Sequence, residues 1–194
     1  LASMVIAIDK TTYDAVKRHV PEANVSLVPN PINTEKLPAI SEECRKQVAF
    51  LGWVVPTKGV GELVQAWNTV GAEYSDYQLL VIGQSKPEYL QKMKACSHVP
   101  NICFTGEMEH DKAMETVAQS QVFILPSYTE GFPNAVVEAM ALKKAVIGTT
   151  VGAIPEMLGD DCGILIEPRN VEHIESALRT LLGNSELRSQ MAQN

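Results

Sequence analysis

Short runs of aliphatic and β-branched residues recur along the chain, and they are continuous instead of alternating with polar residues. Strands covered by helices on both faces have this pattern, which indicates a parallel sheet. The predicted strands are Val5–Ile8, Val25–Val28, Val48–Leu51, Leu79–Ile82, Ile102–Phe104, Val122–Leu125, Ala145–Ile147 and Ile164–Ile166.

Apolar residues between these runs fall at helical spacing. Clear stripes lie within Val60–Val70, Ala113–Ala118 and Val171–Leu182, and a nearly all-apolar segment covers Ala135–Leu142. Strands and helices that alternate in this way form repeated β–α–β units. We therefore expect an α/β fold, with a doubly wound, Rossmann-like parallel sheet and helices on both of its faces.

The pattern breaks between Pro29 and about Cys44, where a segment with three prolines shows no periodicity. We interpret residues 31–43 as a connector and residues 44–194 as the main domain. Residues 1–30 have room for one strand, one helix and one strand, too few to bury a core alone. We expect them to be the end of a neighbouring domain or a segment docked on the edge of the main one, so the chain is interpreted as part of a longer polypeptide.

Composition and charge narrow the function classes. Hydrophobic residues make up 45% and charged residues 20%, the balance of an ordinary globular protein. Lys and Arg number 16 against 23 Asp and Glu, so the formal charge is −7. A broad nucleic-acid or anionic-membrane surface is not expected at this charge. An anionic ligand would have to be held by a few local donors.

Cysteine and histidine spacing favours no metal site. The cysteines Cys44, Cys96, Cys103 and Cys162 lack CxxC spacing, and each lies beside an apolar run, so we expect small buried side chains in a reducing, cytoplasmic environment. Surface positions are expected for His19, His98, His110 and His173, none of which stands beside an acid in a strand-end loop. No apolar stretch approaches the roughly 20 residues of a membrane span.

The most informative segment joins the Val122–Leu125 strand to the Ala135–Leu142 helix. Ligands of open α/β sheets bind beyond the carboxyl ends of the strands, where this loop would lie. Gly131 would let a ligand approach the backbone, and Pro133 suits a first helical turn. The helix start then offers free N–H groups and a positive dipole end, which suit a diphosphate.

Two carboxylates flank this helix start. Glu138 stands among apolar residues, where a charge needs polar partners. It either caps a backbone loop or pairs with Lys143 or Lys144, or it accepts hydrogen bonds from a ribose. Glu130 stands eight positions earlier, and a structural pairing of Glu138 would leave it unexplained. One carboxylate for a nucleotide ribose and one for a second polyol would explain both.

Other strand ends carry weaker signals. Lys58 would stand at a helix N-terminus, where a bound anion would favour a cation; a solvated loop lysine is the alternative. Gly83 follows a strand and permits either close ligand approach or a simple turn. The backbone from Gly106 to Met108 could contact the base of a nucleotide. A dinucleotide fingerprint fails, because Val64 stands in place of its third glycine.

The order of these pieces resembles the C-terminal domain of retaining GT-B glycosyltransferases of family 4, the glycosyl transferases group 1 set. The resemblance covers about Val25 to Leu182 and is most specific in Pro126–Ala141, with its two glutamates eight positions apart. It further includes Val28–Asn33, Phe50–Trp53, Lys58–Gly59, Leu80–Gly83, Phe104–Gly106 and Gly152–Glu156.

The resemblance implies a donor site for a nucleotide-diphosphate sugar. Glu138 would bind the ribose, Glu130 the hydroxyls of the transferred sugar, and Lys58 the diphosphate. The backbone around Gly131, Phe132 and Pro133 would meet the phosphates or the sugar. Gly83 and the Gly106–Met108 backbone would line the nucleotide pocket.

The resemblance also implies partners and a reaction. A sugar would pass to a saccharide or glycolipid acceptor with retention of configuration, with no cofactor, no dedicated metal and no nucleic acid. An N-terminal acceptor domain of the same polypeptide would complete the cleft and provide any peripheral membrane contact. We expect this chain alone to bind donor weakly and to be inactive. Polysaccharide or glycolipid assembly is the implied pathway class.

One departure from the family pattern concerns the phosphate site. Many members carry an arginine where this chain has Trp53, and Arg45 or Lys86 are the candidates to replace it. Two alternatives to a transferase therefore stay open: a non-catalytic nucleotide-binding half, which Trp53 favours, and a GT-B epimerase acting on a UDP-sugar.

Overall fold

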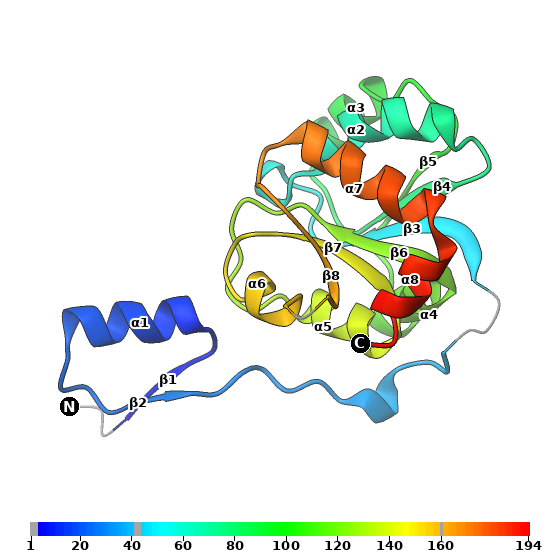
Figure 1. The fold of residues 1–194 in the computed structure, drawn as a ribbon. Coiled ribbons are helices and arrows are strands. Elements are labelled where there is room, and N and C mark those ends of the chain that lie inside the picture. The colour runs from blue at the N-terminus through cyan, green and yellow to red at the C-terminus, as the bar shows by residue number, and fades with distance from the viewer. Residues whose placement is uncertain (1–3, 41–43, 160) are drawn as a thin grey trace.

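A computed structural model describes residues 4–40, 44–159 and 161–194 of the chain. Its centre is a six-stranded sheet in which every strand pair is parallel (Figure 1). The strands lie in the order β5 (Ile102–Gly106), β4 (Gln78–Ile82), β3 (Arg45–Leu51), β6 (Ser120–Leu125), β7 (Ala145–Thr149) and β8 (Gly163–Ile166). The predicted doubly wound parallel sheet is confirmed.

Helices cover both faces of this sheet (Figure 1). One layer contains α2 (Val60–Glu73), α3 (Pro87–Ala95) and α7 (Val171–Gly183), and the other contains α4 (His110–Gln119), α5 (Asn134–Ala141) and α6 (Ile154–Met157). A last helix, α8 (Ser185–Met191), packs against α7 and β7. The two layers follow from the strand order, because right-handed crossovers change face where the order reverses.

The core lies between the sheet and both helical layers. In β6, the residues Val122 to Leu125 are at most 2% exposed, which explains why the strand runs are continuous and not alternating. Phe50 and Phe123 of the sheet and Trp67 of α2 are fully buried in this core.

The helices agree with their predicted positions within a few residues. One detail differs: Pro133 is the N-cap of α5, with ψ of 102°, and is not in its first turn. Two helices had no clear apolar stripe. In α3 only Met93 is buried and in α8 no residue is, so hydrophobic periodicity could not reveal them.

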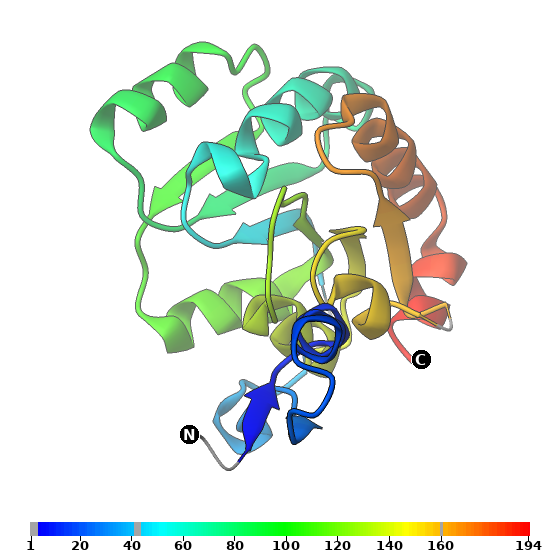
Figure 2. The same ribbon diagram turned by 90° about the vertical axis from the view of Figure 1, so that its left-hand side faces the viewer.

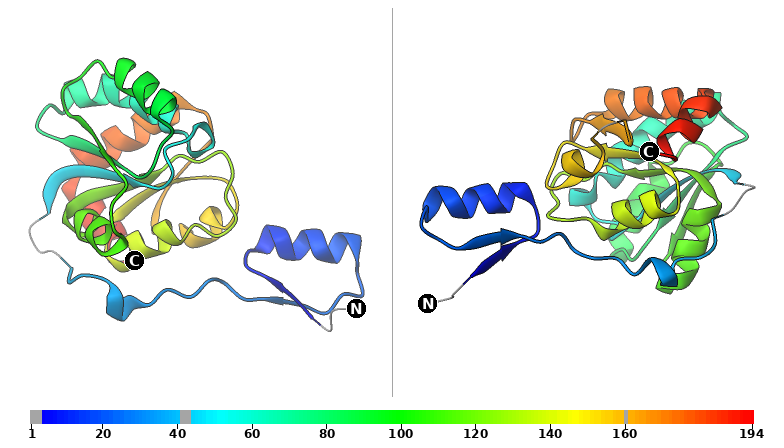
Figure 3. Two further views of the ribbon diagram at one scale, coloured as in Figure 1. Left: turned by 180° about the vertical axis from the view of Figure 1, so that it is seen from behind. Right: turned by 60° about the horizontal axis from the view of Figure 1, so that its bottom comes forward.

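The N-terminal segment forms a separate small unit of β1 (Val5–Ala7), α1 (Lys10–His19) and β2 (Val25–Leu27). Its strands pair in parallel with each other and not with the six-stranded sheet, and the unit projects from the main body (Figures 1 and 3). It approaches the α5–α6 side of the body (Figure 2). There the Lys10 amide donates to Glu156 Oε1 at 3.2 Å. The predicted strand–helix–strand order is confirmed, while its assignment to a neighbouring domain stays a prediction.

The connector is extended apart from the short 3₁₀ helix η1 (Thr34–Lys36), which the Asn33 side chain caps. It runs along the α4–α5 side of the body (Figures 1 and 3). Its predicted residues 41–43 lie outside the described residues. Asn30 Nδ2 lies 3.4 Å from Asn134 Oδ1, at the start of α5.

The histidines are exposed, as expected. The expectation of buried cysteines is wrong for Cys96, which is exposed after α3, and the other three are half-buried. Cys96 ends a helix whose outer side faces solvent, so a neighbouring apolar run did not guarantee burial. Within the described ranges, no helix is long and apolar enough to cross a membrane.

Candidate functional site

The strand order reverses between β3 and β6, and the loops after these two strands meet at their carboxyl ends. Such a switch point is where open α/β sheets bind ligands. The loop after β3 leads through the 3₁₀ helix η2 (Pro56–Lys58) into α2. The loop after β6 carries residues 126–133, and its Tyr128 amide donates to Thr57 O at 2.8 Å. This hydrogen bond joins the two loops.

Two glycines allow the backbone to pack closely around the 126–133 loop. Gly59 has φ of 69°, and a Cβ there would lie 2.0 Å from Pro126 O. Gly152 has φ of 55°, and a Cβ there would lie 2.3 Å from Glu130 O. Both positions therefore require glycine for conformational and steric reasons. The loop is held between the start of α2 and the turn before α6.

This packing brings Lys58 and Glu130 together. Lys58 Nζ lies 2.6 Å from Glu130 Oε1, and the side chains are 27% and 9% exposed. The pair joins residues 72 positions apart in the chain. Lys58 is thus not a solvated loop lysine. Glu130 supplies the negative charge that a lysine at a helix N-terminus needs.

Glu138 lies on α5 with only 13% of its side chain exposed. Its Oε1 lies 2.9 Å from Nε2 of His110, the first residue of α4. The alternative pairing with lysine is wrong for Lys144, whose Nζ donates to Ala118 O at 2.7 Å, and the described ion pairs do not include Lys143. His110 is exposed, as expected, but its contact with Glu138 was not predicted.

Glu138 faces a cavity of about 160 Å³. Residues of the connector and of the α4 and α5 starts line it: Pro31, Ile32, Asn33, Lys36, Leu37, His110, Asn134 and Glu138. The connector therefore forms one wall of the cavity beside Glu138, the residue predicted to bind the ribose. Sequence reasoning did not assign the connector or His110 to the site. The position of His110 at the start of a helix that follows a strand was a signal that could have found it.

The predicted backbone residues after Glu130 lie next to the N-terminal unit. Gly131 O accepts a hydrogen bond from the Ala153 amide at 2.9 Å. Phe132 lines an apolar cavity of about 360 Å³ together with Ile8 of the N-terminal unit and Met140 of α5. Pro133 is buried and holds the N-cap position of α5, without a side-chain cap hydrogen bond. α5 is therefore only half-buried, since part of its apolar face opens onto this cavity.

The remaining predicted residues lie at the ends of β4 and β5. A Cβ at Gly83 would lie 1.9 Å from Gly52 O, so contact between strand ends already requires this glycine. Gly106 O accepts from the Gly83 amide at 2.9 Å. The Met108 side chain packs against a small hydrophobic cluster that contains Leu80. A Cβ at Gly106 would meet no atom within 4 Å, so open space remains beside this part of the predicted nucleotide pocket.

Two residues of the 126–133 loop were not singled out. Burial raises the pKa of the Tyr128 hydroxyl, and a hydrogen bond to Glu62 raises it further, so this tyrosine stays protonated. The Arg169 guanidinium lies 4.6 Å from its ring centre. Ser127 is fully buried, and its hydroxyl is the one buried side-chain polar atom in the described residues without a hydrogen-bond partner.

Of the two cations that could replace the family's arginine at the Trp53 position, only one lies near the switch point. Arg45 begins β3 and so lies at the amino edge of the sheet, far from the switch point. Lys86 follows β4 at the carboxyl edge and lines a groove with Trp53. The described residues contain no group of three or more His, Cys, Asp or Glu side chains placed to hold a metal ion.

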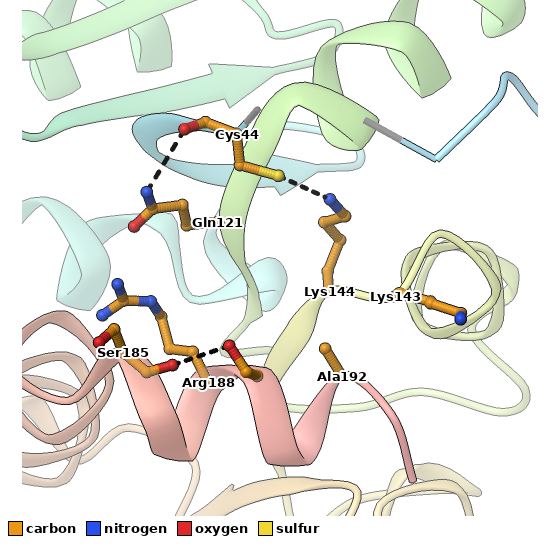
Figure 4. Close-up of a pocket in the computed structure, with 8 residues that line it drawn as sticks. Cys44, Gln121, Lys143, Lys144, Ser185, Arg188 and Ala192 are labelled. Carbon is orange, nitrogen blue, oxygen red and sulfur yellow. Dashed lines mark hydrogen bonds between the residues drawn. The ribbon is translucent and has the colours of Figure 1, made fainter. Parts of the chain in front are cut away.

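A cavity of about 420 Å³ lies at the opposite, amino edge of the sheet (Figure 4). Lys144 points across it toward Cys44, with Nζ 3.2 Å from Sγ, while Lys143 points away. Arg188 Nη1 donates to backbone carbonyls at the end of α7. Lys144 and Arg188 thus bind sulfur and backbone acceptors at this edge. Because the cavity lies at the amino edge of the sheet, it is separate from the switch-point site.

Comparison with known proteins gives a family match over most of the chain. The family described as "Glycosyl transferases group 1" matches residues 33–194. A GDP-mannose-dependent monoacylated alpha-(1-6)-phosphatidylinositol monomannoside mannosyltransferase of Corynebacterium glutamicum is 30% identical over 71% of this chain and 38% of its own length. A capsular polysaccharide biosynthesis glycosyltransferase of Staphylococcus aureus is 27% identical over 76% of this chain and 39% of its own length. The chain thus spans less than half the length of these two relatives.

Solved structures show the same fold. The C-terminal domain of a glycosyl transferase group 1 family protein from Francisella tularensis matches 84% of this chain and 94% of its own, with 28% identity and a TM-score of 0.71. An Anabaena protein crystallised with UDP matches 99% of this chain and 57% of its own, with 18% identity and a TM-score of 0.85. The family match over residues 33–194 shows that the chain belongs to the glycosyl transferases group 1 family.

Proposed function

We propose that this chain is the donor-binding, C-terminal half of a GT-B enzyme. The complete protein transfers a sugar from a nucleotide-diphosphate sugar to a saccharide or glycolipid acceptor, with retention of configuration. The observation that carries the proposal is the Lys58–Glu130 ion pair at the β3/β6 switch point. The family match and the solved C-terminal domain support it.

The ion pair fits a bond between a sugar and a phosphate. Lys58 is a cation at the start of α2 and can stabilise the charge of a departing diphosphate. Glu130, within 2.6 Å, can accept hydrogen bonds from sugar hydroxyls. In this proposal the bond that breaks lies beside the pair, with the phosphate toward Lys58 and the transferred ring toward Glu130.

Glu138 fits the ribose. Its carboxylate is mostly buried but opens onto the cavity beside α5. Oε1 faces His110, which leaves Oε2 for a ribose hydroxyl. His110 fixes the orientation of the carboxylate and acts as a positioning residue. The start of α5, which has no side-chain cap hydrogen bond at Pro133, would add backbone N–H groups toward the phosphates.

The relatives support this substrate class without fixing the donor. The corynebacterial relative is named as GDP-mannose-dependent, and the Anabaena structure contains UDP. Both are nucleoside diphosphates, and neither base is assigned to this chain. The staphylococcal relative is named for capsular polysaccharide biosynthesis, which supports a saccharide acceptor.

A donor screen on the full-length protein tests the proposal. UDP, GDP and ADP sugars are titrated by calorimetry. The donor that binds is then incubated with saccharide and glycolipid acceptors, and the anomeric configuration of the transferred sugar is determined by NMR. We expect one nucleotide class to bind and the product to retain the donor configuration. Binding without turnover in the presence of varied acceptors would favour a non-catalytic half. Release of UDP from a UDP-sugar without acceptor, together with an epimerised sugar, would favour an epimerase.

A further inference from the structure

The cavity at the amino edge of the sheet has a volume of about 420 Å³ (Figure 4). Small-molecule sites in proteins have volumes of about 300–1,000 Å³, so this cavity is large enough for a small ligand. The charged side chains in its described lining are all cations: Lys143, Lys144 and Arg188. The whole chain carries a formal charge of −7, so the sign of the charge is reversed at this place. A local reversal of this kind favours an anionic ligand.

Lys144 is buried beside this cavity, with only 3% of the residue exposed. Its side chain extends across the cavity (Figure 4), where Nζ donates to Ala118 O at 2.7 Å and lies 3.2 Å from Cys44 Sγ. An ammonium group has three N–H donors, so one remains after these two contacts. The ion pairs of the described part of the chain do not include Lys144. Because a buried charge is costly without a group of opposite charge, an anion beside Lys144 would stabilise the folded chain.

Arg188 of α8 supplies a second set of donors. Its Nη1 donates to Leu181 O and, at 3.1 Å, to Leu182 O. Among the hydrogen bonds and ion pairs of the described residues, none uses its Nε or Nη2. A guanidinium with two adjacent N–H groups available can bind two oxygens of one anion. Arg188 for two oxygens and Lys144 for a third favour a phosphate group, since a carboxylate has only two.

Helix ends offset part of this positive charge. The carbonyls that accept from Lys144 and Arg188 belong to the last turns of α4 and α7. Each helix C-terminus carries the equivalent of about half a negative charge, so two of them offset about one of the two cations. Lys46 of β3 lies within electrostatic range of Arg188 and is itself paired with Asp76, with Nζ 2.5 Å from Oδ2. The helix ends thus explain where the two cations point, but they leave about one positive charge at the cavity.

We propose that this cavity is a second ligand site, and that it binds a phosphate group, either free or carried by a small metabolite. Nε and Nη2 of Arg188 donate to two phosphate oxygens, and Lys144 Nζ donates to the third. Ser185 and Ser189 are exposed in the cavity lining, so the site is open to solvent, and their hydroxyls can bind the rest of a metabolite. The site lies at the edge of the sheet opposite the Lys58–Glu130 pair, so it does not depend on the proposed function.

Calorimetry of the full-length protein tests the site without turnover. The probes are inorganic phosphate, glycerol 3-phosphate, glycerate and glycerol. We expect saturable binding of the phosphate compounds, weaker binding of glycerate, whose carboxylate has two oxygens, and no binding of glycerol. Tighter binding of glycerol 3-phosphate than of inorganic phosphate would identify a phosphorylated metabolite as the ligand. Equal affinities would identify free phosphate, and either result supports the site.

Two variants of α8 locate the binding. Ser189→Glu adds a carboxylate to the cavity lining without removing a cation, and it should weaken phosphate binding by about tenfold through repulsion. Gln190→Glu makes the same change of net charge at the next residue, which is exposed but does not line the cavity, and it should bind phosphate normally. Both residues are exposed, so we expect both variants to fold, and thermal unfolding checks this.

Lys58→Gln separates this site from the switch point, because it should weaken nucleotide binding and leave phosphate binding at the amino edge unchanged. Four results would overturn the inference: no phosphate compound binds, glycerate binds as tightly as glycerol 3-phosphate, Ser189→Glu binds phosphate like wild type, or Lys58→Gln abolishes phosphate binding. Glu42 and Glu43 precede Cys44 in the sequence and lie outside the described residues. Phosphate binding that occurs only after both are changed to Gln would make carboxylates of the chain itself the partners of these cations, and would equally contradict the proposal.

Discussion

Lys58 stands at the start of α2, where the helix dipole disfavours a cation, and Glu130 compensates this charge at 2.6 Å. The sequence around either residue does not reveal this contact, because the two residues are 72 positions apart. Their contact makes a pair that can share a substrate, since Lys58 can turn to a phosphate while Glu130 turns to a hydroxyl.

Glu138→Gln should weaken nucleotide binding by roughly ten- to a hundredfold, because a charge-assisted hydrogen bond contributes about 1.5–3 kcal/mol and a neutral amide accepts less strongly. Calorimetry of the full-length protein with the bound nucleoside diphosphate measures this. Glu115→Gln, an exposed glutamate on α4, is the matched control and should bind normally. Equal affinities for wild type and Glu138→Gln would rule out the ribose role.

Glu130→Ala should impair binding of the nucleotide sugar and spare the free nucleotide. The removed carboxylate accepts sugar hydroxyls in our proposal, while Lys58 stays available to the diphosphate and loses its competing partner. Paired titrations with the nucleotide sugar and its nucleotide give the ratio of affinities. Glu130→Gln keeps an acceptor oxygen and should lie between the two. If both ligands weaken equally in Glu130→Ala, the sugar role is incorrect.

At the scale of elements, the C-terminal end of α5 has a residue type that does not suit its backbone conformation. Lys143 follows the C-cap of α5 with φ of 56°, a left-handed conformation that helices normally give to glycine at this place. The turn is needed because the chain must enter β7 two residues later. A side chain in this conformation costs about 1 kcal/mol.

Lys143→Gly should therefore raise the unfolding temperature by about 2–4 °C, the shift that about 1 kcal/mol produces in a domain of this size. Differential scanning calorimetry measures it. Lys143→Ala removes the same long side chain but keeps Cβ, so it should bring no such gain. A gain of similar size in both variants would show that the lysine side chain, not the backbone conformation, is responsible.

The contact between α2 and α7 carries a pH dependence. Arg179 donates to both carboxylate oxygens of Glu73 at 2.8 Å, which lowers the pKa of Glu73. The folded state thus holds this proton less tightly than the unfolded state. The stabilisation is present above the ordinary glutamate pKa of about 4.3 and is lost as the pH falls through the lower folded value.

Arg179→Gln should lower the unfolding temperature at pH 7, and its difference from wild type should shrink as the pH falls below about 4. Thermal unfolding monitored by circular dichroism across this range measures the difference. Lys112→Gln removes an exposed lysine on α4 that forms none of the described ion pairs, and it should show no such trend. A difference that stays constant with pH would mean that Arg179 acts through packing alone.

At the scale of the whole molecule, two units of very different size share one chain. The six-stranded unit has a continuous core, whereas the N-terminal unit leaves Ile6, Leu27 and Val28 exposed. Few polar contacts join them, among them the Lys10 amide with Glu156. Exposed apolar residues on so small a unit are the kind of surface that further chain or a partner covers.

A chain that starts at residue 31 should therefore keep the cooperative unfolding of the main body, with an unfolding temperature within a few degrees of the 194-residue chain. It should keep its nucleotide affinity too, since the connector wall beside Glu138 is retained. Calorimetry and nucleotide titration of both chains measure this. A large fall in unfolding temperature would show that the N-terminal unit belongs to the core of this domain.

The predictable part of the fold came from local signals. Continuous apolar runs marked the strands, and helical stripes marked α2, α4 and α7, because burial on both sheet faces leaves a regular imprint on the sequence. The strongly polar α3 and α8 carry no such imprint. Glu130 and Glu138 could be predicted as site residues because a carboxylate beside or within an apolar helix is costly unless polar partners or a ligand contact it.

By itself, the sequence determined the parallel sheet, the break at the connector and the residue types offered at the strand ends. Only the tertiary structure decided which of these residues meet: Lys58 with Glu130 across 72 positions, and His110 with Glu138 across 28. It also decided that the connector lines the Glu138 cavity and that Trp53 lies open beside Lys86. The physical reason is that periodicity reports whether a residue is buried, whereas contacts between loops depend on strand order and on the close backbone approach that Gly59 and Gly152 permit.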